Sequence, residues 1–271
     1  MTAFSQHVAE LTGVAEERLE PLVGESVSEV LLVRRPNGPI SVAKQSPAIA
    51  TEAAMLRAIA GAGVPAPMVE GEHEGVLLLD YVENDAVFSA NAWADVGARI
   101  RQLHDRTGSA YGWPVDYAIG TVTFDNRETG DWPAFWGEQR LVATASLLDR
   151  PWRARIERLA MRLGDLLPAD PPAALLHGDL WTGNILVREG RLVGLIDPAC
   201  YYGDAEVDLA MLDLFSTPPE EFDEAYGALA PGWRERRPIY QLFPALAHVR
   251  LWGAGYYAMV ERLLAAAGAS L

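Results

Sequence analysis

The sequence of 271 residues is poor in cysteine, in lysine and in long apolar runs. Its one cysteine, Cys200, excludes a disulfide within the chain and fits a reducing compartment. No apolar run approaches the roughly 18 residues that a membrane-spanning helix needs. The first residues also lack the basic stretch followed by an apolar stretch that marks a secretory signal. These absences predict a cytoplasmic protein.

Positive charge is scarce as well. The chain carries 22 lysine and arginine residues against 37 aspartate and glutamate residues, which gives a formal net charge of −15. Such a surface repels phosphate backbones and anionic lipid head groups, so neither nucleic acid nor a membrane is expected as a partner. A content of 50% hydrophobic and 22% charged residues is ordinary for a globular protein and excludes a disordered or fibrous chain. These features do not determine the oligomeric state; a monomer is compatible with them.

Lysine is the rarest of the charged residues, because Lys44 is the one lysine and all the other basic residues are arginines. An ammonium group is compact, whereas a guanidinium is broad and planar. A lysine kept in an arginine-rich chain therefore suggests a site that needs the smaller cation. The alternative is compositional drift that left one lysine by chance.

The N-terminal part of the sequence is predicted to contain strands and one helix. The apolar segments 29–34 and 40–44 flank residues 36–39, whose sequence Pro-Asn-Gly-Pro is a strong turn signal, and this pattern predicts a hairpin. Ser46 and Pro47 fit the cap and the first residue of a helix that would end near the following glycines.

A boundary between two lobes is expected where the apolar strand 75–82 gives way to the polar residues 83–85. Residues 1–82 would form the smaller lobe and residues 83–271 the larger. In the larger one, apolar residues recur at steps of three and four over 93–103, 135–147, 156–167 and 239–264, which predicts helices. A second hairpin, with strands 184–188 and 192–196, interrupts them. The expected fold class is α+β.

The residues that carry chemistry lie in and around this second hairpin. Residues 177–184 read His-Gly-Asp-Leu-Trp-Thr-Gly-Asn and follow the H-x-D-x-x-x-x-N spacing of a kinase catalytic loop. Asp179 is the candidate base for a substrate hydroxyl. Asn184, with Asp197 at the end of the hairpin, offers the oxygen ligands that Mg²⁺ prefers. This pattern predicts an ATP-dependent phosphotransferase.

Two other interpretations stay open for this segment. His177, Asp179 and Asp197 could be ligands of a metal-dependent hydrolase, although the sequence has no second histidine cluster to complete such a site. Alternatively, the turn could be purely structural, which would leave three polar residues at kinase spacing unexplained. His104 and His248 stand alone on apolar helices, where a histidine is more often a core residue than a ligand.

A kinase also needs a nucleotide-binding half. Lys44 lies late in the first hairpin, and Glu52 follows on the predicted helix, so an ion pair between them would direct the ammonium at the phosphates. The phosphate-covering loop would be residues 24–28, with Gly24 and Ser26 as contacts. This loop lacks the G-x-G-x-x-G pattern, and an ordinary turn into a strand is equally compatible with it. Asp80 and Val82 are further nucleotide-binding candidates, at the lobe boundary.

The sequence resembles the fructosamine kinase (ketosamine kinase) family, a branch of the aminoglycoside phosphotransferase-like kinases. The resemblance extends over most of the chain. Its most specific parts are Leu180-Trp181 after the catalytic aspartate and the run Asp197-Pro198-Ala199-Cys200-Tyr201-Tyr202-Gly203. The sequence departs from the family pattern at Val23, where a second glycine is usual, and at Asp204-Ala205, where a basic pair is usual.

The resemblance implies a bilobal protein-kinase-like fold, the cofactors ATP and Mg²⁺, and phosphorylation of the 3-hydroxyl of ketoamines such as fructosamines or ribulosamines, in a deglycation role. The acceptor would be a small molecule or would be attached to a protein. Trp181 could stack on a sugar or pack between the lobes. Tyr201 and Tyr202 could line the acceptor cleft or pack beneath it. His177 and Asp208 would support the catalytic loop. Other small-molecule kinases, acting on aminoglycosides, choline or homoserine, and a pseudokinase without catalytic activity are the alternatives.

Overall fold

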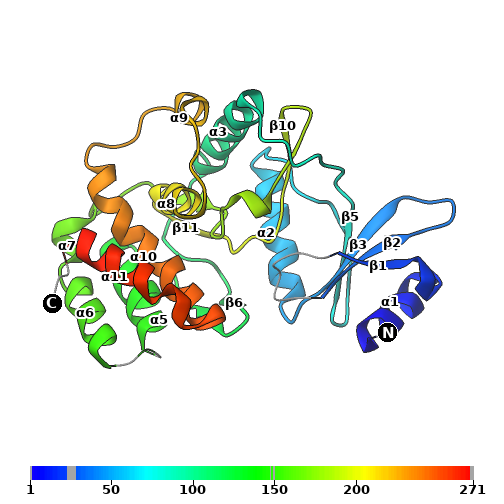
Figure 1. Ribbon diagram of the computed structural model, residues 1–271, viewed down its shortest axis with the longest axis horizontal. Coiled ribbons are helices and arrows are strands. Elements are labelled where there is room, and N and C mark those ends of the chain that lie inside the picture. The colour runs from blue at the N-terminus through cyan, green and yellow to red at the C-terminus, as the bar shows by residue number, and fades with distance from the viewer. Residues whose placement is uncertain (1, 23–28, 147, 149, 269–271) are drawn as a thin grey trace.

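The computed structural model describes residues 2–22, 29–146, 148 and 150–268, which fold into a small sheet-containing lobe and a larger helical lobe (Figure 1). The strands are β1 (Leu19–Pro21), β2 (Val30–Arg34), β3 (Ile40–Gln45), β4 (Val69–His73), β5 (Val76–Asp80), β6 (Tyr117–Ile119), β7 (Val122–Phe124), β8 (Ala174–Leu176), β9 (Ile185–Arg188), β10 (Arg191–Leu195) and β11 (Tyr201–Gly203).

The α-helices are α1 (Ala3–Thr12), α2 (Ile49–Gly61), α3 (Ala90–His104), α4 (Trp132–Ala134), α5 (Ala143–Ala145), α6 (Arg150–Ala160), α7 (Leu163–Leu166), α8 (Glu206–Phe215), α9 (Glu220–Tyr226), α10 (Trp233–Trp252) and α11 (Tyr257–Ala266). Three short 3₁₀ helices are η1 (Glu16–Arg18), η3 (Thr182–Asn184) and η4 (Ala254–Tyr256), and η2 (Phe135–Val142) is a π-helix. Among the described residues, no helix is long and apolar enough to cross a membrane.

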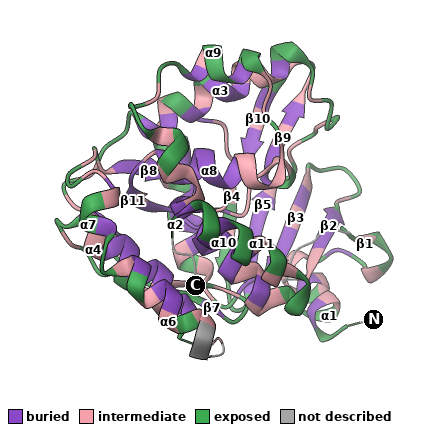
Figure 2. Ribbon diagram, turned by 60° about the vertical axis from the view of Figure 1, so that its left-hand side comes forward, coloured by how far each residue is buried: buried purple, intermediate pink, exposed green. Residues whose placement is uncertain are grey.

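The small lobe is built on a five-stranded antiparallel sheet with the strand order β1-β2-β3-β5-β4. Successive side chains of a strand point to opposite faces of its sheet. In β5, Val76 and Leu78 therefore pack with α1 on one face, and Leu77 and Leu79 pack with α2 on the other. Because both faces are covered, residues 76–79 of this strand are an unbroken apolar run, and Figure 2 shows the strand as mostly buried. The predicted hairpin is confirmed as β2 and β3.

Two sequence predictions for this lobe are wrong in detail. The lobe has a second helix, α1, where the sequence analysis expected one helix in all. Helix α2 begins at Ile49 after the cap residue Ala48, and not at Pro47. The Ser46 hydroxyl accepts a hydrogen bond from the Ala48 N–H at 3.2 Å. It therefore closes a local turn before the helix instead of capping the helix itself.

Helix α2 connects the two lobes. One part of its surface, Ala53 and Leu56, packs on the sheet. Another part, Met55 and Ile59, joins a cluster with α3 and the hairpin β9–β10 of the large lobe. Glu52 lies on the same helix, so the packing that joins the lobes also fixes the position of its carboxylate.

The large lobe has a core in which helices surround several two-stranded ribbons. Aromatic side chains of η2, α4 and α10 fill its centre, with Trp132, Trp136 and Tyr240 fully buried. The predicted hairpin is confirmed as β9 and β10, and the apolar stripe over 239–264 corresponds to two helices separated at Gly253. Strands β8 and β11 pair with each other, which brings the segments before and after this hairpin together.

Candidate active site

The catalytic-loop segment leaves β8 through a turn in which only glycine fits. Gly178 has φ +81°, and a Cβ atom at this position would lie 2.0 Å from the carbonyl oxygen of Ala199. The Ala199 N–H donates to the carbonyl of His177 at 2.8 Å, which holds the two chain segments at that distance. The His177 ring is buried, and its Nε2 lies 2.9 Å from the Ile196 carbonyl oxygen. The turn is therefore held against the segment that leads to Asp197.

Asp208 supports this turn, as the sequence analysis expected. Its carboxylate accepts hydrogen bonds from the backbone N–H of His177 at 2.7 Å and of Gly178 at 2.9 Å. His104 lies 3.1 Å from the same carboxylate through Nε2 and 2.8 Å from the Tyr226 hydroxyl through Nδ1. Burial by itself would raise the pKa of Asp208, but these hydrogen bonds outweigh it and hold the pKa below its ordinary value. His104 is thus a buried histidine with a hydrogen-bond partner at each ring nitrogen. One of these partners is Asp208, the residue that supports the catalytic loop.

Asp179 and Asn184 face each other across the loop. The Asn184 amide nitrogen donates to the Asp179 carbonyl oxygen at 2.8 Å and to the carboxylate at 3.1 Å. Burial raises the pKa of Asp179 to about 7, and the nearby Asp197 and Asp208 add to the effect, while the bond from Asn184 opposes it. A carboxyl group with such a pKa has a high affinity for a proton, as a base that receives one from a hydroxyl requires.

Lys44 joins the small lobe to Asp197. Its ammonium lies 2.6 Å from Glu52 and 2.7 Å from Asp197, so the predicted ion pair with Glu52 is present. Burial by itself would lower the pKa of Lys44, but the two carboxylates raise it above its ordinary value. Asp197 has φ +52°, a left-handed conformation that aspartate tolerates better than most residues. The structure therefore brings Lys44 and Glu52, from successive elements of the small lobe, together with Asp197, which lies 153 residues after Lys44.

The oxygen atoms near Asn184 and Asp197 suit a hard cation. The two residues are held together because the Ile196 N–H donates to the Asn184 carbonyl at 3.0 Å. The Asn184 side chain uses its nitrogen for Asp179, which leaves its amide oxygen available as a ligand. Mg²⁺ is usually bound through one or two protein groups together with substrate phosphates. Accordingly, the described residues contain no group of three or more His, Cys, Asp or Glu side chains that could hold a metal on their own.

The other nucleotide-binding candidates are placed differently. Gly24 and Ser26 lie outside the described residues. The Asp80 carboxylate accepts a hydrogen bond from the N–H of Met68, the residue before β4, so this side chain ties that residue to the end of β5. Val82 lies on the segment between the lobes and is next to Gly194 of β10. A Cβ atom added to Gly194 would lie 3.4 Å and 3.7 Å from the two Val82 methyl groups.

The three aromatic acceptor candidates fall into two groups. The Trp181 indole is half-buried and folds back over Gly183, where a Cβ atom would lie 2.3 Å from the ring. Tyr201 is fully buried, with the Arg140 guanidinium 4.2 Å from its ring centroid. Tyr201 is thus a core residue of the large lobe. Tyr202 is half-buried and packs beside Trp113, with a distance of 5.9 Å between ring centroids.

One residue near the site was missed by the sequence analysis. Tyr117 lies on the hairpin β6–β7 of the large lobe and packs against the cluster that contains Met55 and Ile59 of α2. Burial, followed by the Glu52 charge, raises the pKa of its phenol. Tyr117 could not be selected from the sequence for two reasons. Strands β6 and β7 have three residues each, which is too few to show an alternation of apolar and polar residues, and the kinase pattern does not include a tyrosine. The support of Asp208 by His104 was also missed, because nothing in the sequence relates positions 104 and 208.

Comparisons with known proteins identify the family. The fructosamine kinase family model matches residues 2–268. A protein of Thermus thermophilus named as a probable ketoamine kinase is 35% identical over 262 residues, which are 93% of this chain and 95% of that protein. A solved structure assigned as a fructosamine-3-kinase of Thermobifida fusca superposes with a TM-score of 0.86 at 29% identity, over 99% of both chains.

The fold is shared more widely. A choline/ethanolamine kinase family protein of Mesorhizobium loti superposes with a TM-score of 0.66 at 20% identity, over 96% of this chain and 94% of that one. At this identity the similarity establishes the fold alone, which is the bilobal, protein-kinase-like fold that the family resemblance implies. The family model covers nearly the whole chain and agrees with the resemblance of the loop and hairpin residues. The chain belongs to the fructosamine kinase family.

Proposed function

We propose that the protein transfers the γ-phosphoryl group of ATP to the 3-hydroxyl of a ketoamine, with Mg²⁺ as the metal ion. The observation that carries this proposal is the convergence of Lys44, Glu52 and Asp197 on one side with Asp179 and Asn184 on the other. Phosphoryl transfer needs a charged cradle for the donor and a carboxylate beside the acceptor hydroxyl. Both are supplied by residues that the fold brings together.

In this reaction the acceptor oxygen forms a bond to the γ-phosphorus, the bond between that phosphorus and the bridging oxygen of ATP breaks, and ADP leaves. Asp179 orients the hydroxyl and receives its proton. Lys44 neutralises phosphate charge, and Glu52 and Asp197 hold its ammonium in place. Asn184 and Asp197 would hold Mg²⁺, which when bound supplies further neutralisation of the phosphate charge.

The acceptor is proposed on the basis of the family and of charge. The T. fusca structure and the T. thermophilus protein are named for fructosamine and ketoamine substrates. A ketoamine formed on an amine remains cationic, and a protein with a net charge of −15 attracts a cation. The exposed part of the Trp181 indole could stack on the sugar. Phosphorylation at the 3-position and a role in deglycation are the finer parts of the proposal.

The expected location is the cytoplasm. Cys200 is the only thiol and is fully buried, and burial raises its pKa well above the usual value. A buried, protonated thiol is not a redox centre, which fits a reducing compartment.

An acceptor screen tests the proposal. Purified protein with ATP and Mg²⁺ is offered fructosyl- and ribulosyl-lysine, choline, homoserine and an aminoglycoside, with ADP release as the readout. We expect ADP release with the two ketoamines only, and phosphorus NMR of the product should show coupling to the proton on C3. Turnover of choline or the aminoglycoside with no ketoamine turnover would overturn the substrate, and no ADP release with any acceptor would support a pseudokinase.

Asp179→Asn tests the proposed base. This variant keeps the size and most hydrogen bonds of the side chain but has little affinity for a proton. We expect kcat to fall by roughly 100-fold or more, in line with the usual contribution of general base catalysis. ATP binding, measured by calorimetry, should stay within about a factor of two of the wild type. Near-normal turnover would remove Asp179 from this role.

A further inference from the structure

Glu52 has one carboxylate oxygen without a partner. The residue is 1% exposed, and its Oε1 accepts the Lys44 ammonium at 2.6 Å. Its Oε2 is buried and accepts no hydrogen bond among the described residues. An unpaired buried acceptor destabilises the folded protein, and a charged one does so more strongly. A missing donor at this oxygen therefore calls for an explanation, because Glu52 positions the only lysine of the chain.

The large lobe presents a donor in this region. Tyr117 lies at the start of the hairpin β6–β7, which Figure 1 shows on the side of the large lobe that faces α2. Tyr117 packs against the cluster that contains Met55 and Ile59 of α2, the helix that carries Glu52. Burial, followed by the Glu52 charge, raises the pKa of Tyr117 above its ordinary value. The phenol accordingly keeps its proton and remains a hydrogen-bond donor.

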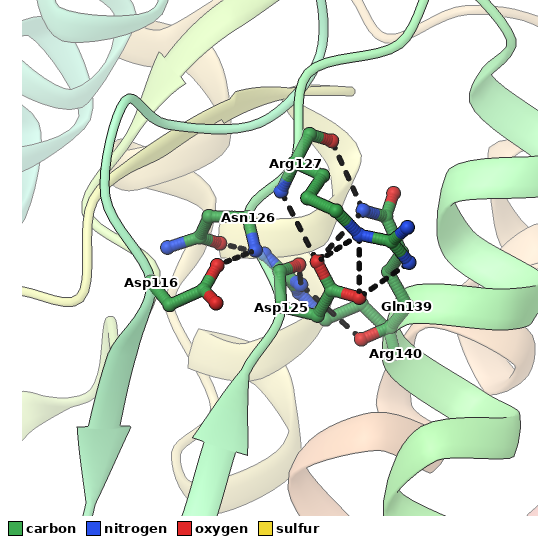
Figure 3. A network of polar contacts seen from close by, with 6 residues as sticks. All are labelled: Asp116, Asp125, Asn126, Arg127, Gln139 and Arg140. Carbon is green, nitrogen blue, oxygen red and sulfur yellow. Dashed lines mark hydrogen bonds and ion pairs between the residues drawn. The ribbon is translucent and has the colours of Figure 1, made fainter.

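The hairpin that carries Tyr117 is firmly anchored in its own lobe. The neighbouring Asp116 accepts a hydrogen bond from the Asn126 N–H at 2.8 Å, and the Asn126 side chain accepts one from Arg140 at 2.7 Å (Figure 3). Arg140 also donates to the Asp125 carbonyl oxygen at 2.6 Å. These bonds close the open end of the hairpin, so its position follows that of the large lobe.

The hairpin is also held by packing. The ring centroids of Tyr117 and Phe124 are 6.2 Å apart, and those of Phe124 and Phe243 are 5.2 Å apart. Phe243 belongs to α10 and is buried in the core. Tyr117 is therefore a side chain of the large lobe whose ring is fixed by its own lobe and packs against the cluster shared with α2 of the small lobe.

We propose that Tyr117 is a positioning residue, whose hydroxyl donates to Glu52 Oε2 in the nucleotide-bound enzyme and so holds Lys44 in place from the opposite lobe. This bond would connect the two lobes directly at the phosphate site. This proposal rests on one part of the proposed function, namely that a nucleotide binds between the lobes. It does not depend on which acceptor is phosphorylated.

Tyr117→Phe tests the proposal because it removes the hydroxyl and keeps the ring that packs on Phe124. Binding of ATP with Mg²⁺ is measured by calorimetry without any acceptor, so the result is independent of whether ketoamines are phosphorylated. We expect the dissociation constant to rise roughly 10- to 100-fold, the effect of one hydrogen bond to a charged group. The KM for the ketoamine should be unchanged in steady-state assays.

A double-mutant cycle identifies the partner. In a Glu52→Gln background, Tyr117→Phe should have a much smaller effect, because the charged acceptor is already gone. The matched control is Tyr111→Phe, whose hydroxyl donates to the Pro171 carbonyl at 2.7 Å away from the cleft and should leave nucleotide affinity unchanged. Unchanged nucleotide affinity in Tyr117→Phe, equal effects in both backgrounds, or a rise in the ketoamine KM alone would each overturn the proposal.

Discussion

At the scale of single residues, the catalytic loop is constrained by space as much as by chemistry. Gly178 and Gly183 lie where a Cβ atom would come within 2.0 Å of a carbonyl oxygen and 2.3 Å of an indole ring. The first contact is with the backbone of Ala199, which is itself hydrogen-bonded to His177, so it cannot move away easily. The two glycines thereby fix where Asp179 and Trp181 lie.

Gly178→Ala should therefore damage both stability and activity. A left-handed conformation costs an alanine roughly 1–2 kcal/mol, and overlap with fixed backbone adds roughly 1–3 kcal/mol. The matched control is Gly75→Ala, because Gly75 has a similar φ of +76° but nothing within 4 Å of its Cβ position. Urea unfolding should show the conformational cost alone for Gly75→Ala and a clearly larger loss for Gly178→Ala, with a fall in kcat only for the latter. Equal losses in the two variants would contradict the steric argument.

The residues of the proposed site could be selected from the sequence because a kinase reaction restricts their types and spacing. The kinase pattern includes a carboxylate and an amide five residues apart, a second carboxylate after a hairpin and a lysine in the first hairpin. The residues that support them are restricted by the fold alone. His104 beside Asp208 and Tyr117 near Glu52 are pairs distant in sequence, and each of these residues looks ordinary in its own segment.

At the scale of elements, hairpins and helices with local signals were predictable and short ribbons were not. The turn residues between β2 and β3 and between β9 and β10 specify those hairpins within a few residues. Helix α1 also had a local signal that was missed, since Thr2 and Ser5 form a capping box and Gly13 ends the helix in a left-handed conformation. The paired residues of β8 and β11 are at least 25 positions apart in the sequence. Each strand has three residues, which are too few to show the alternation of apolar and polar residues that identifies a strand.

The loop after β7 provides an element-scale prediction of pH dependence. Asp125 accepts hydrogen bonds from Arg127 at 2.8 Å and from Gln139 at 3.1 Å (Figure 3). The bond with Arg127 is the largest cause that lowers the pKa of Asp125 to about 2. A carboxyl group with a lower pKa in the folded than in the unfolded chain stabilises the fold above its unfolded pKa of about 4. That stability is lost as the pH falls from about 4 to about 2.

Asp125→Asn should consequently lower the free energy of unfolding at pH 7, and the difference from the wild type should shrink as the pH approaches 3. Urea unfolding at pH 7, 5 and 3 measures both. Glu128→Gln is the control, because Glu128 is an exposed acid of the same loop. A difference for Asp125→Asn that stays constant over this range would mean that the charge of Asp125 contributes nothing and that only its shape matters.

At the scale of the whole molecule, the near absence of lysine has a consequence for an enzyme that acts on glycated amines. A reducing sugar forms a ketoamine only with an accessible, unprotonated amine. Lys44 is 7% exposed, and its ammonium is held between Glu52 and Asp197, which raise its pKa. The folded protein thus offers a sugar almost no side-chain amine, whereas its arginines lack the primary amine that a ketoamine requires.

We expect prolonged incubation with ribose to add sugar only at the α-amino group of the folded wild-type chain, as seen by intact-mass and peptide mass spectrometry. Arg57→Lys should gain one further adduct, because the Arg57 side chain is 58% exposed. The same incubation in urea should expose Lys44 and add sugar there, since unfolding separates the ammonium from both carboxylates. Glycation of Lys44 in the folded protein, with loss of activity, would show that the two carboxylates and the surrounding packing do not protect the amine. Protection of Lys44 therefore depends on the fold as a whole, because its two partners come from different lobes.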